Sequence, residues 1–337
     1  MFETRSSASS SSENREKVTI REVAQRAGVS IGTVSRALKN QGGLTEDTRQ
    51  HVLRAAQDLG YDTSNLRQKI RRLSFVMSRQ LDVPTNPFYS HVLHGVEDAC
   101  RENDVVLQYL TLRSGDRALD LLRRHGADAF LCAGYFEPRL LERVAALGVP
   151  LVLIDHFLPG IAAVNSDNVA GTRMAVRHLL ERGRRRVAFV NGPGHYSVQQ
   201  RLLGFREALF AAGLPADPRL EVGGEGALLP EDVARATDAL LSLEPPPDAV
   251  VCWNDECALS VIQRLKERGL SVPGDIAVVG FDDIDAAKHA NPALSTVRVD
   301  KEHLGRRGLE LLLERASGNH LEPVELIVRA SSQPGDE

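Results

Sequence analysis

The feature that most constrains the fold of this chain is an alternation that begins at Leu73. Short apolar runs are followed by longer segments with a 3.6-residue apolar period, and this pair repeats almost to the C-terminus. Strand, helix, strand in this order predicts an α/β fold, with a parallel sheet covered by helices on both faces. The number of units fits either one closed barrel or two open, doubly wound sheets. The expected strands are 73–77, 105–110, 128–134, 150–156, 186–192, 248–255, 276–283 and 324–331, and the expected helices include 90–102, 139–147, 168–182, 198–212, 231–243 and 256–268.

Composition excludes several classes of protein. Apolar residues make up 42% of the chain and charged residues 26%, which is ordinary for a globular protein and excludes a wholly disordered chain. The four cysteines form no C-x-x-C pair, so free thiols are expected. Residues 1–16 are polar and Ser-rich, which predicts a disordered tail without a secretory signal. No apolar run approaches the ~20 residues of a membrane-spanning helix, so we expect a cytoplasmic protein without a membrane partner.

Three short helices are predicted ahead of the α/β body. Thr19 and Glu22 form a T-x-x-E capping box, which satisfies free backbone N–H groups where the first helix begins. Gly28 is expected to end this helix. Ser30 and Thr45 are the expected N-caps of the second and third helices.

The first two of these helices have the spacing of a helix-turn-helix. In segment 18–38, Ala24 is small where two helices would cross, Gly28 lies in the turn, and Val34 packs the second helix on the first. Up to Arg72 the formal charge is +5, whereas the remainder carries −9. A basic head on an acidic body is expected when only the head meets a polyanion. We therefore predict double-stranded DNA as a partner; the alternative is an ordinary small helical hairpin.

The segment VTIREVAQRAGVSIGTVSRAL, followed by LTEDTRQHVLRAAQDLGY, resembles the DNA-binding head of the lactose-repressor family of bacterial transcription regulators. The body carries NPFYSHVLHGVEDA, SDNVAGTRMAVRHLLERGRRRVAFVNGP, RLLGFREAL, GLSVPGDIAVVGFDD and NPALSTVRVD in the order of the same family. The resemblance covers about residues 17–335 and implies a two-lobed, periplasmic-binding-protein-like effector domain of doubly wound parallel sheets behind a small all-α head. The expected divisions are a disordered tail (1–16), a helix-turn-helix domain (17–62), a hinge (63–72) and an effector-binding and dimerisation domain (73–335), whose N-lobe is about 73–165 plus 298–320 and whose C-lobe is about 166–297 plus 321–335.

The resemblance also implies which residues contact DNA. The second helix, expected over 31–39, would lie in the major groove. Ile31 and Gly32 occupy its variable specificity positions, and Arg36 matches a position used for base or phosphate contact. Gly32 has no side chain to contact a base. Ile31 can make only an apolar contact, for instance to a thymine methyl group. The remaining candidates for contacts to DNA are Thr19, Ser30, Thr33 and Ser35.

The hinge departs from the pattern of the family. Segment 63–72 has Thr63 where the family has proline, and it is a few residues short. In the family the hinge forms a helix that inserts an apolar side chain into the minor groove. Ile70 is the first candidate for that insertion and Leu66 the second, while the alternative is a plain basic linker.

Polar residues follow several expected strands of the body. Open α/β sheets bind ligands at the carboxyl ends of their strands, so these residues mark a crevice. Carboxylates, one arginine and aromatic faces suit a polyol such as a sugar. The resemblance implies effector contacts for Phe88, Tyr89, Asp155, Ser197, Arg201, Asp255 and Asp282, and Trp253 is added from its place at a strand end.

Other interpretations of these residues stay open. Phe88 and Tyr89 also fit a structural role in the core. Asp282 could only cap the next segment, and Arg201 could only form a structural ion pair. If the effector interpretation holds, we expect Arg201 and Asp255 to face each other across one cleft.

The sequence therefore predicts a transcription regulator, in the common mode a repressor, that acts as a homodimer and responds to a sugar or another small metabolite. No catalytic residues, metal ligands or cofactor are predicted, because no nucleophile–base pair, metal-binding spacing or phosphate loop is visible. The alternatives are a ligand-responsive activator and a solute-binding protein without a regulatory role.

Overall fold

The structure is a computed structural model. It describes residues 18–38, 43–61, 69–78, 86–112, 117–214, 217–224 and 229–333. The chain divides into two compact units, Met1–Lys69 and Ile70–Glu337, which are described in turn.

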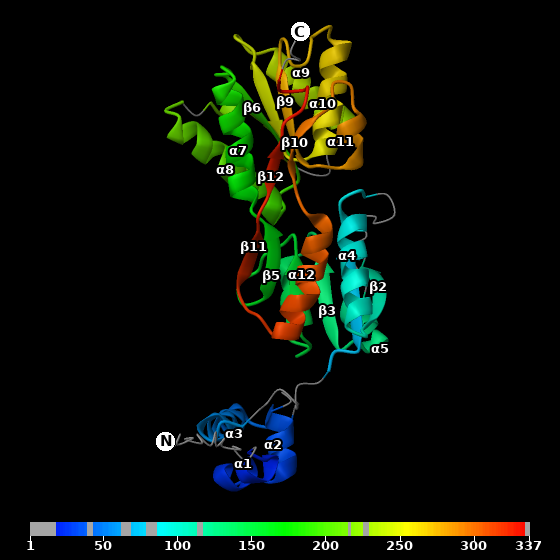
Figure 1. Ribbon diagram of the computed structural model, residues 1–337, viewed down its shortest axis with the longest axis vertical. Helices are drawn as coiled ribbons and strands as arrows, with labels where there is room; N and C mark the ends of the chain where they lie inside the picture. Colours follow the sequence, from blue (N-terminus) through cyan, green and yellow to red (C-terminus); the bar gives the residue numbers. More distant parts are fainter. Residues whose placement is uncertain are drawn as a thin grey trace, which may run out of the picture. The chain divides into compact units, whose positions relative to one another are not determined.

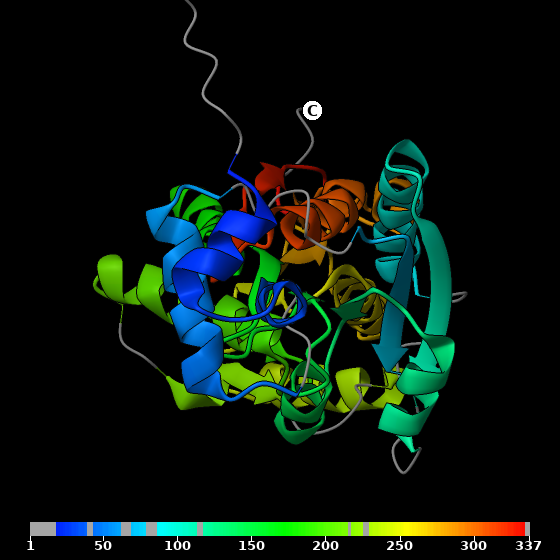
Figure 2. The same ribbon diagram turned by 90° about the horizontal axis from the view of Figure 1, so that it is seen from below.

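The smaller unit contains three helices, α1 (Ile20–Ala27), α2 (Ile31–Leu38) and α3 (Glu46–Asp58), drawn in blue in Figures 1 and 2. They pack around a small apolar core in which Val23, Val34 and Val52 are fully buried; this core uses one face of each helix. All three predicted helices are confirmed.

The caps predicted for these helices are present. The Thr19 side chain accepts a hydrogen bond from the Glu22 amide, and the Glu22 carboxylate accepts one from the Thr19 amide at 2.6 Å. Gly28 ends α1 with φ +62°, a left-handed conformation that glycine adopts without strain. Ser30 and Thr45 accept hydrogen bonds from backbone amides at the starts of α2 and α3.

The larger unit is built on two open sheets. The first has the order β11 (Asn319–Glu322), β5 (Ala162–Ser166), β4 (Leu151–Ile154), β3 (Ala129–Ala133), β1 (Arg72–Ser78), β2 (Val106–Leu112), with all neighbours parallel. The second has the order β12 (Glu325–Ile327), β10 (Ser295–Arg298), β9 (Ala277–Asp282), β8 (Ala249–Cys252), β6 (Val187–Asn191), β7 (Glu221–Gly223), and in it only the β12–β10 pair is antiparallel. The predicted α/β class is confirmed, and the barrel alternative is wrong. No strand was predicted at β5, β7, β10 or β11, and the strand expected at 324–331 is limited to β12.

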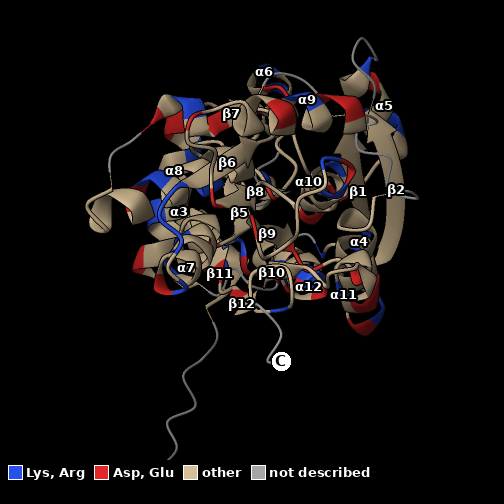
Figure 3. Cartoon of the chain, turned by 90° about the horizontal axis from the view of Figure 1, so that it is seen from above, with Lys and Arg blue, Asp and Glu red and all other residues tan. Residues whose placement is uncertain are grey.

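Helices cover both faces of each sheet. On the first sheet, α4 (Tyr89–Glu102) and α12 (Lys301–Glu314) cover one face, and α5 (Ala118–His125) and α6 (Pro138–Ala145) the other. On the second, α7 (Asn168–Glu181) and α8 (Tyr196–Ala211) cover one face, and α9 (Pro230–Leu241), α10 (Asp255–Glu267) and α11 (Asp285–His289) the other. Charged residues lie mainly on these outer helices, as the blue and red segments of Figure 3 show. Each sheet with its helices forms one lobe.

The chain passes between the lobes three times, after β5, after β10 and after β11 (Figure 1). The second passage leads into α12, which packs directly on α4. Two glycines allow this close approach: a Cβ on Gly95 would lie 1.9 Å from the Glu302 carbonyl oxygen, and one on Gly305 would lie 2.0 Å from that of Val92. The three passages bring the carboxyl ends of the parallel strands of both lobes to one cleft.

Candidate functional sites

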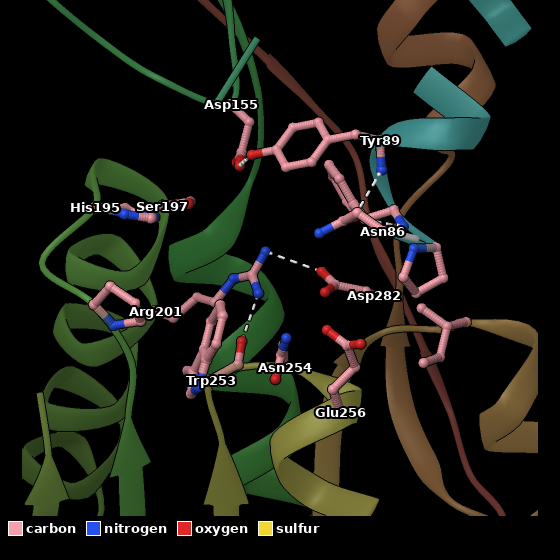
Figure 4. Close-up of a pocket in the computed structure, with 14 residues that line it drawn as sticks. Asn86, Tyr89, Asp155, His195, Ser197, Arg201, Trp253, Asn254, Glu256 and Asp282 are labelled. Carbon is pink, nitrogen blue, oxygen red and sulfur yellow. Dashed lines mark hydrogen bonds and ion pairs between the residues drawn. The ribbon is translucent and has the colours of Figure 1, made fainter. Parts of the chain in front are cut away.

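A cavity of about 230 Å³ lies between the two lobes, at the carboxyl ends of their strands (Figure 4). This is the position where open α/β sheets bind ligands. Seven of the eight residues predicted to contact an effector line this cavity: Phe88, Tyr89, Asp155, Ser197, Arg201, Trp253 and Asp282. The other lining residues were not among the predicted effector contacts; they are Asn86, Pro87, Pro193, His195, Asn254, Glu256 and Ile284. We call this cavity the cleft.

Arg201 is the most extensively bonded side chain of the cleft. It is only 4% exposed. Its guanidinium donates to Asn168 Oδ1 at 2.8 Å, to the Trp253 carbonyl oxygen at 2.5 Å and to Asp282 Oδ1 at 3.1 Å, and it lies 3.7 Å from the centre of the Phe281 ring. These contacts use three of the five N–H donors of the guanidinium. The side chain is therefore fixed in one position and retains donors for a ligand.

Asp282 is the acidic partner of Arg201. Its backbone has φ +109°, an unusual conformation for a residue other than glycine, and such conformations cluster at functional sites. Burial raises the pKa of its carboxyl to about 6, although the nearby charges of Arg201 and Lys301 act in the opposite direction. The Lys301 ammonium donates to the backbone carbonyls of Asp282 and Asp283, which holds this loop in place.

Tyr89 and Asp155 line the cleft from the other lobe. The Tyr89 hydroxyl donates to Asp155 Oδ2 at 2.7 Å; burial, together with this carboxylate, raises the pKa of Tyr89. Phe88 packs edge-on against Tyr89, with ring centres 5.0 Å apart. Asn86 Oδ1 accepts the backbone N–H groups of both aromatic residues and so fixes the start of α4. Phe88 and Tyr89 are thus at once buried in the core and part of the cleft wall.

Asp255 does not line the cleft. It is fully buried; Oδ1 accepts the Thr296 hydroxyl at 2.5 Å, and Oδ2 accepts the Ile284 amide at 2.9 Å. Burial and the nearby charge of Asp282 raise the pKa of its carboxyl to about 8. The expected pair of Arg201 and Asp255 is therefore not found, because Arg201 bonds to Asp282 instead. Asp255 joins the start of α10 to the segments after β9 and in β10.

A second group of side chains joins the two lobes beside the cleft. The His195 ring stacks on Tyr135 with centres 4.9 Å apart and an angle of 8°, and Tyr196 packs against Phe157 at 5.5 Å. His195 and Tyr196 begin α8 in one lobe, whereas Tyr135 and Phe157 follow strands of the other. Burial lowers the pKa of His195, which favours the uncharged imidazole. No local pattern predicts these pairs, since their members lie far apart along the chain.

The helix predicted to enter the major groove presents few side chains at its start. Ile31 is 47% exposed, which is unusual for an isoleucine, and a Cβ on Gly32 would make only an ordinary contact, with Ser30 Oγ at 3.7 Å. Arg36 is exposed, and its Nε–H donates to the Gly32 carbonyl oxygen at 3.4 Å. Thr33 shares a hydrogen bond with the capping residue Ser30 at 2.9 Å.

Both units match known families. Residues 19–64 match the family described as bacterial regulatory proteins, lacI family, and residues 176–332 match the periplasmic binding protein-like domain. The HTH-type transcriptional repressor CytR of Escherichia coli (strain K12) is 32% identical over 339 residues, which cover 94% of this chain and 96% of that protein. The chain belongs to the lacI family. This lacI-family chain is a helix-turn-helix transcription regulator.

Other lacI-family proteins show the same extent of similarity. The HTH-type transcriptional regulator CelR of Thermobifida fusca is 33% identical over 94% of this chain and 97% of its own length. A solved structure described as a complex of the transcriptional regulator CelR with cellobiose has a TM-score of 0.70 at 31% identity, and the match covers 94% of this chain and 100% of that one. A lac repressor dimer bound to operator and the anti-inducer ONPF is 24% identical with a TM-score of 0.69, which supports the fold alone.

Three more of the predicted DNA contacts, two in the head and one in the hinge, have definite positions. Thr19 is engaged in the capping box of α1, and Ser35 is half-buried on α2. Ile70 is 4% exposed and packs in the core of the larger unit, just before β1. A side chain held in that core is not available to a DNA groove. Leu66, the second candidate for insertion, lies outside the described residues.

No group of three His, Cys, Asp or Glu side chains among the described residues could hold a metal ion. Within the same part of the chain, no helix is long and apolar enough to cross a membrane.

Proposed function

We propose that this chain is a repressor that binds operator DNA as a homodimer and changes its affinity for the operator when a neutral, sugar-like effector enters the cleft. The observation that carries the proposal is the buried Arg201–Asp282 pair at the strand ends of one lobe, opposite Asp155 and Tyr89 of the other. Because it acts on DNA, we place the protein in the cytoplasm.

The chemistry of the cleft suits a polyol ring. Carboxylates such as Asp155 and Asp282 accept hydrogen bonds from hydroxyl groups, while Arg201 donates to ring or hydroxyl oxygens. Phe88 and Trp253 supply apolar surface for the C–H face of a sugar. The volume of about 230 Å³ lies below the ~300–1,000 Å³ typical of ligand pockets, which favours a compact ligand. The relative described as bound to cellobiose indicates the same class of compound.

The two lobes provide the coupling between ligand and DNA. A ligand that contacts Arg201 in one lobe and Asp155 in the other favours the conformation in which both are close. Any change in operator affinity that results must be reciprocal, because the two binding equilibria share one protein.

In the head, we propose that α2 lies in the major groove with Ile31 against a thymine methyl group and Arg36 at a guanine or a phosphate. Thr19, Ser30, Thr33 and Ser35 are proposed phosphate contacts. For the minor groove, the burial of Ile70 favours Leu66 as the inserted side chain. Gly32 adds no contact of its own, so the sequence-dependent shape of DNA would contribute to specificity.

The test begins with selection of an operator from random DNA by the full-length chain. The protein is then screened for ligand-induced rises in melting temperature with sugars, including cellobiose. An effector at about 100 times its dissociation constant adds roughly 2.7 kcal/mol to the free energy of unfolding. We expect each such ligand to change operator affinity by the factor by which the operator changes ligand affinity. A chain that selects no DNA sequence, or a ligand that leaves operator affinity unchanged, contradicts the proposal.

A further inference from the structure

One carboxylate of the cleft stands apart from the others. Glu256 is the second residue of α10, and its side chain lines the cavity next to Asp282 (Figure 4). Asp155 is bonded to Tyr89 and Asp282 to Arg201. In the described part of the chain, by contrast, no hydrogen bond or ion pair is found for the Glu256 carboxylate.

The position of Glu256 follows from its neighbours in sequence. The Asn254 side chain caps α10 by accepting the Cys257 amide at 2.9 Å, and Asp255 is fixed below the cleft by Thr296. The next residue along the helix is therefore directed to the cavity side. Glu256 is exposed to solvent, and partial desolvation by the surrounding atoms of the cleft raises the pKa of its carboxyl.

The charged groups of the cleft do not balance. The described lining contains three carboxylates, those of Asp155, Glu256 and Asp282, against one guanidinium, that of Arg201. His195 adds no cation while its imidazole is neutral. The Lys301 ammonium is bonded to backbone carbonyls and does not line the cavity. A concave site that carries more charge of one sign than of the other repels ligands that carry the excess sign.

We propose that Glu256 selects the effector by charge: it accepts a hydrogen bond from a hydroxyl or amino group of a neutral or cationic ligand and excludes phosphorylated and carboxylated compounds. This inference rests on the proposed effector site and narrows its ligand class.

Another physical role for Glu256 needs a control. An acidic residue in the first turn of a helix is favoured by the helix dipole wherever it lies. Glu231 has the same position in α9, as the residue after Pro230, but it does not line the cleft. Glu231→Gln therefore removes a first-turn charge of the same kind without changing the cleft.

The experiment uses the full-length protein and matched pairs of probes. The pairs are glucose with glucose 6-phosphate, adenosine with adenosine 5′-monophosphate, and cellobiose with cellobionate, and glucosamine is added as a cationic probe. Melting shifts and titration calorimetry are recorded for the unchanged chain, for Glu256→Gln and for Glu231→Gln. All three proteins are also tested for binding to the selected operator without ligand.

We expect at least one neutral or cationic probe to bind and its anionic partner to bind about tenfold more weakly or worse, as repulsion at contact distance implies. Glu256→Gln should reduce this ratio severalfold and weaken any binding of glucosamine, while Glu231→Gln changes neither.

Three results would overturn the inference. They are an anionic probe that binds as tightly as its neutral partner, a ratio that Glu256→Gln leaves unchanged, and a panel in which only anionic probes bind. If the unchanged chain fails to bind any operator, that is a separate result. It contradicts the proposed function, but the charge preference of the cleft can still be measured.

Discussion

The head and the cleft hold their proposed functional side chains in opposite settings. In the head, Ile31 and Arg36 are exposed and make few contacts within the protein. In the cleft, Arg201 and Asp282 are 4% and 7% exposed and are bonded to each other. The proposed DNA surface is therefore built from side chains that the fold does not need, whereas the proposed effector surface is built from side chains that also stabilise the larger unit. Variants in the head should therefore change function without changing stability, whereas variants in the cleft should change both.

The largest effect is expected for Arg201→Ala. The change leaves the buried Asp282 carboxylate, the Trp253 carbonyl and Asn168 without their donor. Removing one partner of a buried ion pair costs about 3–5 kcal/mol, so we expect a loss of this size in the free energy of unfolding, together with loss of the ligand-induced melting shift. Urea unfolding and a melting screen of the same samples provide the measurement.

The control for this variant lies on the same helix. Arg206 pairs with Glu221 at 2.6 Å, but its side chain is 58% exposed. Arg206→Ala should cost less than about 1 kcal/mol and leave the ligand response intact. Equal losses for the two variants would show that burial does not distinguish Arg201, and the contrast between the head and the cleft would fail.

The next effect concerns Asp255, whose carboxyl has a pKa of about 8 in the folded protein and an ordinary value of 3.8. Between about pH 4 and pH 8 the folded state keeps a proton that the unfolded chain has lost. The free energy of unfolding therefore falls as pH rises through this window and levels off above it. Asp255→Asn retains an oxygen that can accept a hydrogen bond from the Ile284 amide, but it removes the carboxyl group that titrates. The fall of the unfolding free energy with pH should therefore become smaller, most clearly between pH 6 and pH 8.

Asp255→Ala provides the comparison at a fixed pH. It leaves the Thr296 hydroxyl and the Ile284 amide without an acceptor in a buried position, which costs about 1–3 kcal/mol. Chemical unfolding at pH 5 and pH 8 measures both variants. A pH dependence that survives in Asp255→Asn would mean that another group, such as Asp282, is its main source.

In the head, Arg36→Ala should weaken operator binding by about 1–3 kcal/mol if the guanidinium contacts a base in bidentate fashion. Since the side chain is exposed, the melting temperature should not change. Binding is measured on the selected operator and on random DNA over a range of salt concentrations, with Arg26→Ala as a control for loss of one positive charge. Equal weakening on both DNAs would make Arg36 a phosphate contact, and a lower melting temperature would make it a structural residue.

The same contrast explains what the sequence could predict. The head is specified by contacts a few residues apart, such as Thr19 with Glu22, so its three helices and their caps follow from local patterns. Long apolar strands of the body are equally visible. The strand β5 (Ala162–Ser166) was missed because its sequence AAVNS is short and partly polar, and it is buried by helices and strands from distant parts of the chain.

The cleft shows a similar limit. The ends of the expected strands predict where most polar residues of the cleft lie, but they do not predict which of these residues bond to each other. Arg201 bonds to Asp282, which is 81 residues away in the sequence. The other candidate, Asp255, does not line the cavity and instead accepts the Ile284 amide. The stacking of His195 on Tyr135 also depends on how two lobes meet, a relationship for which a single sequence has no periodic signal.

The smallest effect is expected for Ile31, and it tests the head at the level of one methyl group. If Ile31 packs against the C5-methyl group of a thymine, replacing that thymine in the operator with deoxyuridine removes the contact while all hydrogen-bonding groups remain. Burial of one methyl group is worth about 0.8 kcal/mol, so we expect operator affinity to fall about fourfold. Ile31→Ala should show a similar loss on the thymine operator and no further loss on the deoxyuridine operator, with an unchanged melting temperature because the side chain is already 47% exposed. Deoxyuridine scanning of each thymine in one half-site locates the position by fluorescence anisotropy. If no single replacement is silent in the variant and harmful in the unchanged chain, Ile31 does not contact a thymine methyl group, and specificity at the start of α2 must come from DNA shape and from Arg36.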